Sequence, residues 1–372
     1  MTFALTVDAK KFHAHLNSVV AQYQDAGAQV LPVIKGNGYG FGRSVLADEV
    51  NKLELNQVCV GTIWEAAEVL ENFSGQVAVL EPISSSDELA VGQWTTLLDE
   101  HADRLIAVVS STELAVAQKI GVKKVWIEAL TSMNRFGLSP HQIAEVFKKL
   151  NQEISVVGFS LHLPIVAPTI SKLTKFETAE VNSNSNKVRE TVGWISWLSE
   201  TADSTNGPMT ISISHLTPTE VAQVKRERPD VQVQIRLGTS LWLGNPNALS
   251  VTGTVLAVHD ITDNEKVGYQ QNSGGRKVVV VSGGTAHGVA LAAPITTSSL
   301  RKRGIAVVEG LAQAIGRIRS PFTFNGNNLN FVEPPHMQVS MLWADNCPIT
   351  VGDEIACTVR NTTANFDAVI WK

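Results

Sequence analysis

Eight short apolar runs recur through the first two thirds of the chain, and most are followed by a longer stretch of helical periodicity. The runs are rich in Val and Ile and comprise Val30–Ile34, Val58–Gly61, Val77–Leu80, Leu105–Val109, Val125–Glu128, Val156–His162, Thr210–Ser214 and Val231–Ile235. Continuous apolar strands that alternate with helices are typical of a parallel sheet covered on both faces. Eight such units within about 240 residues are the number that closes a barrel. We therefore predict an α/β fold with a (β/α)8 TIM barrel, and an open doubly wound sheet is the alternative.

The stretches between these runs predict the helices that cover such a barrel. They are Ser44–Leu55, Ile63–Glu71, Thr112–Ile120, Ser139–Leu150, Lys187–Thr201 and Pro218–Arg226. Ser139-Pro140 and Thr217-Pro218 are capping signals that mark where two of these helices begin. The polar segment 182–186 is expected to be a surface loop of the barrel.

After Arg236 the pattern changes to short strands separated by turn-rich segments. The predicted strands are Val251–Val258, Lys277–Val281, Ile305–Val308, Met337–Leu342 and Glu354–Val359, with turns near 272–275 and 325–328. This pattern predicts a second, mostly antiparallel β domain. We place the barrel domain at residues 8–243 and the β domain at 244–372 together with 1–7.

Charge and cysteine content narrow the class of protein. The net charge is −5 and Lys and Arg form no run longer than three residues, which disfavours nucleic acid and anionic membranes as partners. The three cysteines, Cys59, Cys347 and Cys357, have no metal-like spacing and favour reduced thiols. The N-terminal segment lacks a signal-peptide pattern, and no run of about 18 apolar residues occurs. We expect a cytoplasmic protein.

Barrel enzymes build their sites at the C-terminal ends of the strands. The functional candidates at or just after these ends are Lys35, Glu128, Arg135, His162, Ser214, Arg236, Gly238 and Thr239. If the barrel is formed, these residues converge on one mouth.

Lys35 directly follows an apolar strand, so little water surrounds the start of its side chain. Desolvation and neighbouring positive charge lower the pKa of a lysine and supply the free amine that imine chemistry needs. The alternative is a strand-end lysine that extends into solvent. The glycines at 36, 38, 40 and 42 suit close approach of a bulky ligand, although they match neither the Walker nor the dinucleotide fingerprint.

The segment Pro32–Gly40, PVIKGNGYG, resembles the cofactor-lysine motif of the alanine racemases, which are fold-type III pyridoxal-phosphate enzymes. Further similar segments follow in the same order along almost the whole chain. Ser132–Gly137 resembles the Met-x-Arg-x-Gly segment, Gly158–His162 the Thr-His strand, Ile235–Gly238 the Arg-x-Gly phosphate turn, Val267–Tyr269 the segment of the second catalytic base, and Val339–Met341 and Val351–Glu354 the late β-domain motifs.

The resemblance implies an amino-acid racemase in which pyridoxal 5'-phosphate is held as an imine on Lys35. Lys35 is then the base on one face of the substrate Cα, and Tyr269 is the base on the opposite face. Inversion at carbon requires two such bases, since one removes a proton and the other returns it. The resemblance also implies a homodimer, because the partner subunit supplies the Tyr269 phenol.

The remaining roles implied by the resemblance concern the cofactor and the substrate. Arg236 faces the pyridine nitrogen and keeps it unprotonated, which weakens the cofactor as an electron sink. His162 orients Arg236, while Gly238, Thr239, Ser214 and Tyr39 bind the phosphate. The substrate carboxylate is expected at Arg135 and at the backbone near Met341.

Several positions depart from the family pattern. Seven residues before the matching arginine many members carry a carbamylated lysine, and here that position is Glu128. We expect Glu128 to pair with Arg135 in place of the carbamate. The entryway segment Tyr-Ala-Asp-Gly is replaced within 284–288, the acid after Met341 is Leu342, and a late phosphate-binding tyrosine has no clear counterpart. Alanine specificity therefore does not follow from the resemblance.

Two other functions stay open. A fold-type III amino-acid decarboxylase usually carries a cysteine near the reacting face, but the surroundings of Cys347 look unlike that segment. A non-catalytic pyridoxal-phosphate-binding protein would keep the lysine without turnover. Tyr269 argues against this function, and Leu342 in place of the acid argues for it. His336-Met337 lacks the cysteine of metal-assisted relatives, so no metal site is expected.

Overall fold

The computed structural model describes residues 2–111, 114–150, 152–166, 183–201, 208–263, 265–269, 271–272 (backbone only), 275–291 and 319–372. The chain divides into two compact units. The barrel unit comprises Ala14–Gly38 and Gly42–Gly244, and the β unit comprises Met1–His13, Tyr39–Phe41 and Asn245–Lys372.

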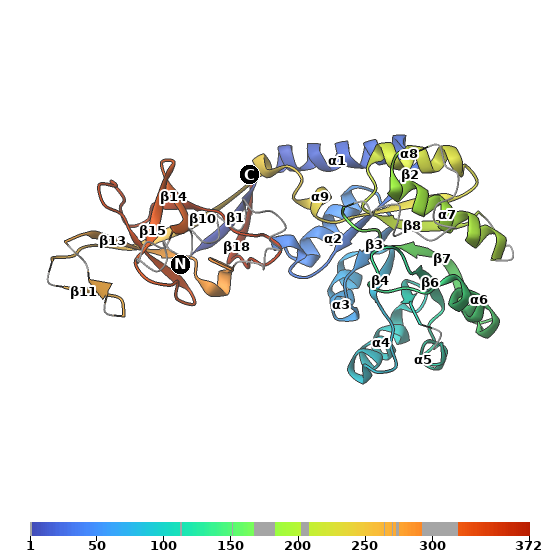
Figure 1. Cartoon of the computed structure of the whole chain (residues 1–372). Helices are drawn as coiled ribbons and strands as arrows, with labels where there is room; N and C mark the ends of the chain where they lie inside the picture. The colour runs from blue at the N-terminus through green and yellow to red at the C-terminus, as the bar shows by residue number, and fades with distance from the viewer. Residues whose placement is uncertain are drawn as a thin grey trace. The chain divides into compact units, whose positions relative to one another are not determined.

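The barrel unit contains a closed barrel of eight parallel strands, which confirms the predicted TIM barrel. In Figure 1 the helices α2 to α8 lie around the outside of these strands. The strands are β2 (Ala28–Ile34), β3 (Gln57–Val60), β4 (Gln76–Pro82), β5 (Leu105–Val109), β6 (Lys124–Ala129), β7 (Ser155–Leu161), β8 (Thr210–Ser214) and β9 (Gln232–Leu237). The helices of the chain are α1 (Ala9–Asp25), α2 (Arg43–Lys52), α3 (Ile63–Asn72), α4 (Glu88–His101), α5 (Ala115–Lys119), α6 (Pro140–Lys149), α7 (Asn186–Thr201), α8 (Pro218–Glu227) and α9 (Thr239–Trp242).

Local sequence explains where the predicted helices begin. Thr62, Ser139 and Thr217 precede α3, α6 and α8, and each forms a capping box with the glutamate or glutamine three residues later. Such a box satisfies backbone N–H groups that the first turn leaves without partners. Three helices, α1, α4 and the single-turn α9, were not predicted. α4 contains Gly92 and two adjacent threonines, which are weak helix formers, so its sequence signal is faint.

The inside of the barrel is apolar on one side and polar on the other. The apolar cluster comes from β2 to β6 and contains Leu31, Val33, Cys59, Ala78, Ile106, Val108 and Trp126. Buried polar side chains occupy β6 to β9, where Glu128, Ser160, Ser212 and Gln234 lie in one row of paired residues. Ser214 and Arg236 form the next pair toward the C-terminal mouth. Strands β6 to β9 therefore carry these buried polar side chains among residues that are mostly apolar.

The β unit is an eight-stranded sheet in the order β13-β16-β15-β14-β17-β10-β1-β18. β13 also pairs with β10, so six of the strands form a closed circuit. All pairings in this sheet are antiparallel except β1 with β18, which confirms the mostly antiparallel prediction. The strands of the unit are β1 (Phe3–Val7), β10 (Leu249–Asp260), β11 (Lys266–Val267), β12 (Gln271–Asn272), β13 (Lys277–Ser282), β14 (Arg319–Phe324), β15 (Asn327–Phe331), β16 (Val339–Trp343), β17 (Glu354–Cys357) and β18 (Ala368–Trp371).

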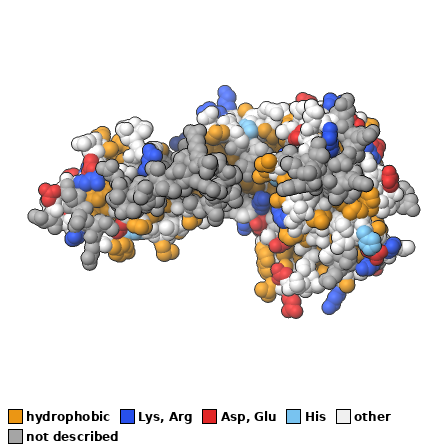
Figure 2. Space-filling model, in the orientation of Figure 1, with side chains coloured by type: hydrophobic (Ala, Val, Ile, Leu, Met, Phe, Trp, Pro, Cys, Tyr) orange, Lys and Arg blue, Asp and Glu red, His pale blue; other side chains and the backbone are white. Residues whose placement is uncertain are grey.

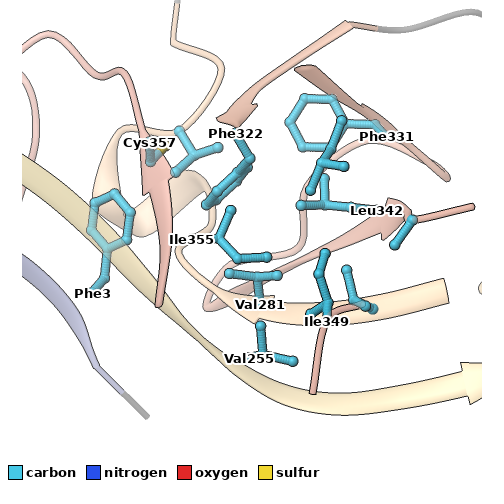
Figure 3. Packing of buried hydrophobic residues seen from close by; sticks show 13 residues of the cluster. Phe3, Val255, Val281, Phe322, Phe331, Leu342, Ile349, Ile355 and Cys357 are labelled. Atoms are coloured by element: carbon cyan, nitrogen blue, oxygen red, sulfur yellow. The ribbon is translucent and has the colours of Figure 1, made fainter. Parts of the chain in front are cut away.

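The core of the β unit lies between these strands. Figure 3 shows Phe322, Phe331, Leu342 and Ile355 directed toward one another, and all of them are buried. β14 and β15 were not predicted as strands, although the Asn325-Gly326 turn between them was expected. The predicted strand Ile305–Val308 lies outside the described residues, as do 182 and 273–274 of two predicted loops.

Charged side chains of both signs are scattered over the visible face of each unit, with hydrophobic side chains between them (Figure 2). Among the helices that the structure describes, none has the length and apolar character needed to cross a membrane.

We predict that Phe322→Ala lowers the free energy of unfolding by about 3–5 kcal/mol, because it opens a cavity in a closely packed core. Urea denaturation followed by circular dichroism measures this loss. Val351→Ala is the matched control, since Val351 is exposed in the same unit and its truncation should cost no more than about 0.5 kcal/mol. Equal losses in the two variants would contradict the prediction.

Candidate functional site

Arg236 is the most deeply buried cation at the barrel mouth, with a 5% exposed side chain at the end of β9. Its guanidinium donates hydrogen bonds from Nη1 to Ser160 Oγ and from Nη2 to the Leu161 carbonyl, the latter at 2.9 Å. Both partners belong to β7, so two barrel strands fix the orientation of the group. The sequence predicted that His162 would orient Arg236, but these hydrogen bonds come from Ser160 and Leu161 instead.

His162 lies directly after β7 and pairs with Ser214 at the end of β8. The Nδ1 atom of His162 is 3.0 Å from Ser214 Oγ, and the His162 and His215 rings meet edge to face with centroids 5.3 Å apart. Burial, together with the charges of Arg236, Arg135 and Lys35, lowers the pKa of His162 to about 3. Burial and the same cations, together with Lys187, also lower the pKa of His215. Both rings are therefore neutral near pH 7.

These shifts reveal the electrostatic character of the mouth. Four cations, Lys35, Arg135, Lys187 and Arg236, act on the two histidine rings. Glu128 is the carboxylate whose charge acts on Arg236 from within the barrel. Positive charge in partly desolvated surroundings attracts anions, so the mouth is suited to bind phosphate or carboxylate groups.

Lys35 is the first residue after β2 and its side chain is exposed. Among the described residues, none accepts a hydrogen bond from its Nζ. Its stem passes close to the backbone of the next strand, because a Cβ added at Gly61 would lie 3.2 Å from the Lys35 Cβ. A residue larger than glycine at 61 would therefore press on Lys35.

The backbone beside Lys35 is held by the carboxylate of Glu65, on the first turn of α3. Oε1 accepts the Gly36 N–H at 2.8 Å and Oε2 accepts the Gly61 N–H at 2.7 Å. On the other side, Arg43 Nη1 donates to the Gly36 carbonyl at 2.6 Å while its Nη2 pairs with Glu68 at 2.5 Å. The loop that carries Lys35 is thus anchored through both polar groups of Gly36.

Arg135 lies in the loop after β6, which is anchored at both ends. Ser132 donates from its backbone N–H and, at 2.7 Å, from its hydroxyl to the buried carboxylate of Glu190 on α7. At the other end of the loop, the Leu138 N–H donates a hydrogen bond to the Glu128 carbonyl at 2.8 Å. The Arg135 side chain is exposed, with its guanidinium carbon 5.1 Å from the centre of the Phe136 ring.

Glu128 does not form the predicted ion pair with Arg135. Its side chain is 3% exposed, and its Oε2 atom has no hydrogen-bond partner among the described residues. The pair is missing because Arg135 extends to the surface over Phe136, whereas Glu128 faces the barrel interior beside Ser160. Burial raises the pKa of Glu128 more than Arg236 and Arg135 lower it. Glu128 is therefore more readily protonated than an ordinary glutamate.

Gly238 and Thr239 form the start of the single-turn helix α9 at the end of β9. The first N–H groups of a helix have no partner within that helix, and here they lie at the same strand end as Arg236. Tyr39 is buried with a φ of 56° and belongs to the β unit, although it follows Lys35 closely in sequence.

Tyr269 and Met341 also belong to the β unit. Tyr269 lies in the turn between β11 and β12, is 80% exposed, and has its ring centroid 5.2 Å from that of His336. Met341 on β16 packs against a small cluster that contains Val267, which precedes the Tyr269 turn. Of the predicted site residues, the structure brings together Lys35, Arg135, His162, Ser214 and Arg236 in the barrel unit.

Sequence reasoning did not find several residues that hold this site. Ser160, Glu190 and Lys187 carry no motif, and only the folded barrel reveals that they contact Arg236, Ser132 and the His215 carbonyl. Glu65 did have a signal, because it stands three residues after Thr62 in a capping box. Among the described residues no cluster of three or more metal-ligating side chains occurs.

Comparison with known proteins places this geometry in a family. Residues 7–213, more than half of the chain, match the family model "Alanine racemase, N-terminal domain". The chain belongs to the alanine racemase family. Its relatives are distant. The chain is 25% identical to the alanine racemase of Shewanella amazonensis over 162 residues, which are 41% of this chain and 40% of that protein. It is 22% identical to the Nitrosomonas eutropha alanine racemase over 307 residues, which are 76% of each.

Solved structures of alanine racemases share the fold of this family member. The structure of alanine racemase from Bartonella henselae with covalently bound pyridoxal phosphate superposes with a TM-score of 0.65 over 100% of both chains, at 17% sequence identity. At this identity the likeness concerns the fold.

This family member differs from the expected pattern in the β unit, and the structure gives the new residues other roles. His287, in the segment that replaces Tyr-Ala-Asp-Gly, is buried and accepts the Gly284 N–H at Nδ1 at 3.1 Å. Its Nε2 lies 3.3 Å from Asp367 Oδ1, so it ties this segment to the C-terminal end. Leu342, in place of an acid, is buried in the apolar core. Both substitutions therefore serve packing within the β unit.

We predict that the stability of the protein falls as the pH is lowered from about 6.5 toward 3, in part because of His162. The pKa of an unfolded histidine is about 6.5, whereas that of folded His162 is about 3, so the unfolded chain binds one more proton in this window. His162→Gln should flatten the dependence of the unfolding free energy on pH, measured by urea denaturation between pH 7 and pH 4.5. The control is His259→Gln, an exposed histidine of the β unit. A slope unchanged by His162→Gln would contradict the lowered pKa.

We also predict that Glu65→Ala lowers the unfolding free energy by about 1–2 kcal/mol, since it removes a helix cap. Hydrogen exchange at the Gly36 and Gly61 amides should accelerate, because both N–H groups lose their acceptor. Glu71→Ala on the exposed side of the same helix is the matched control. Unchanged hydrogen-exchange protection of the two glycine amides in Glu65→Ala would show that the Glu65 carboxylate does not hold the Lys35 loop.

Proposed function

We propose that this protein is a pyridoxal-phosphate-dependent amino-acid racemase in which Lys35 and Tyr269 move the substrate Cα proton on opposite faces. The observation that carries this proposal is the amine of Lys35, free of described hydrogen-bond partners, at a barrel mouth surrounded by cations. Membership of the alanine racemase family supports it, and a structural neighbour carries covalently bound pyridoxal phosphate.

The residues of the barrel mouth fit this cofactor by charge. The excess of positive charge that lowers the pKa values of His162 and His215 calls for an anionic ligand, and a phosphate monoester supplies one. Lys35, Tyr39, His162, Ser214, Arg236, Gly238 and Thr239 would hold the group. When bound, it withdraws electrons from the substrate Cα and so acidifies the Cα proton.

Arg236 contributes a charge that cannot serve as a proton acceptor. An arginine keeps its proton at all working pH values, and here hydrogen bonds to Ser160 and Leu161 fix its direction. A fixed cation facing the cofactor ring limits how strongly the ring is protonated, which favours simple proton transfer over side reactions.

Lys35 and Tyr269 would move the proton. A lysine amine accepts a proton on one face of Cα, and a tyrosine phenol returns one to the other face. Tyr269 suits this role because 80% of its side chain is exposed on its turn. Arg135 is the cation we assign to the substrate carboxylate, together with the backbone near Met341. Because Arg135 is exposed and flanked by Phe136, it can reach a small ligand without moving a packed core.

We also propose a homodimer with shared active sites. Exposed large apolar side chains follow the C-terminal ends of several barrel strands, and these are Trp64, Leu89, Met133, Phe136, Ile165 and Val166. Apolar side chains gathered at one end of a barrel mark an interaction surface. A second copy that brings its exposed Tyr269 to this surface would complete the site.

A cytoplasmic location and a functional division at residues 8–243 and 244–372 with 1–7 belong to the same proposal.

The test is exchange of the substrate Cα–H in heavy water, followed by NMR, with cofactor-loaded protein and single amino acids. We expect exchange with one or a few amino acids, its abolition in Lys35→Ala, and conversion to the opposite enantiomer by chiral analysis. Tyr269→Phe should slow racemisation by about 100-fold or more, as expected for loss of an acid–base group.

The same experiment separates the other functions. Carbon dioxide release without inversion would indicate a decarboxylase. A borohydride-reducible link to Lys35 without any exchange would indicate a non-catalytic cofactor-binding protein and would overturn the racemase proposal.

A further inference from the structure

We infer that Glu333 is a positioning residue for Tyr269, acting together with His336. Glu333 follows β15 and Val332, and its carboxylate is buried beneath the turn that carries Tyr269. The inference rests on the proposed function, in which the Tyr269 phenol moves a proton, and it adds two residues that fix the phenol's backbone.

The first observation is that the two oxygens of the Glu333 carboxylate contact two different groups. Oε2 accepts the backbone N–H of Tyr269 at 2.8 Å, and Oε1 lies 2.7 Å from Nε2 of His336. Glu333 is only 3% exposed. A buried carboxylate is stable when hydrogen bonds satisfy its oxygens, so these two contacts are mutually dependent.

The second observation is the close approach of the turn to this carboxylate. Gly268 has a φ of 57°, and a Cβ added there would lie 2.3 Å from Glu333 Oε1. Only glycine lets the chain adopt this conformation so near the carboxylate. The turn is therefore shaped around Glu333, and the residue that follows Gly268 is Tyr269.

The third observation concerns the Tyr269 ring itself. Its centroid is 5.2 Å from that of His336, with the ring planes at 46°. His336 thus contacts the Tyr269 side chain through its ring and the Tyr269 backbone indirectly through Glu333. An exposed phenol on a hairpin whose strands are only two residues long is otherwise free to move, and these contacts restrict its direction of approach.

The inference predicts an effect on one enantiomer more than on the other. If Lys35 and Tyr269 serve opposite faces, one enantiomer exchanges its Cα proton through Lys35 and the other exchanges it through Tyr269. In both cases the configuration at Cα is retained. A displaced Tyr269 should therefore slow the second exchange while leaving the first nearly intact. A general loss of folding would slow both exchanges equally.

The experiment measures initial rates of Cα–H exchange in heavy water with cofactor-loaded protein and the separate enantiomers of alanine, serine, lysine and glutamate. For Glu333→Gln we expect exchange from one enantiomer to fall by about 10- to 100-fold relative to the other, since small misplacement of a catalytic group has effects of this size. Gly268→Ala, which disturbs the same approach without changing charge, should give the same asymmetry. Asp353→Asn is the matched control, because Asp353 accepts the backbone N–H of Thr350 at 2.8 Å elsewhere in the β unit.

A second readout does not depend on catalysis. The chain has 3 tyrosines, so protein labelled with 15N-tyrosine gives a small set of amide signals, and Tyr269→Phe assigns one of them. In Glu333→Gln the Tyr269 amide proton should shift upfield, because it loses an ionised acceptor. Asp353→Asn should leave that signal in place.

The outcomes are distinct. An amide signal that does not move in Glu333→Gln overturns the inference, and so does a moved signal accompanied by equal slowing of both enantiomers. If the unaltered protein exchanges none of the amino acids, the proposed function loses its support. The claim that Glu333 positions the Tyr269 turn is then decided by the amide signal alone.

Discussion

The burial of Arg236 inside the barrel is the constraint from which most of the mouth follows. A guanidinium taken out of water needs acceptors, and Ser160 and the Leu161 carbonyl supply them from β7. Its charge, which it cannot lose, lowers the pKa of His162 and helps to lower that of His215. The neighbouring rings stay neutral and can pair with hydroxyls such as that of Ser214. Burial and this fixed charge thus act together to keep both histidine rings neutral.

In the β unit, Tyr269, which we propose as the second base, is exposed on a short turn, and its backbone is held in place. The anchor is buried rather than the side chain. Glu333 is inaccessible and fully bonded, whereas Tyr269 extends into solvent directly above it. The barrel uses the same device at Lys35, where Glu65 holds the adjoining backbone and leaves the amine free. In both units a carboxylate accepts a hydrogen bond from the main chain at or next to a residue that we propose as a base.

Sequence reasoning recovered the barrel because its signal is strong and local. All eight predicted strands occur with ends shifted by no more than two residues, since most of them are short segments rich in Val and Ile. It missed α1, which precedes the first predicted strand, although Phe12, Leu16, Val20 and Tyr23 recur at helical spacing and are buried. It missed β14 and β15 because Asn and Pro interrupt their apolar pattern.

The site was predictable where residues stand at strand ends, and unpredictable where contacts join distant segments. Lys35, His162 and Arg236 could be placed at the mouth from position alone. The partners of Arg236 could not, because Ser160 lies 76 residues away in sequence and is one serine among many. The expected pair of Glu128 with Arg135 failed for a related reason. A strand residue that faces inward and a loop residue that reaches outward do not meet, however close they stand in sequence.

The pairing of β1 has a consequence for how the protein is made. Phe3–Val7 lies between β10 and β18, so this strand receives both partners only after the barrel and then β18 have left the ribosome. The barrel strands can pair with one another in the meantime, since they are contiguous in the chain. Until then β1 presents an apolar strand with unused backbone groups. Removal of β18 would leave β1 with one edge open.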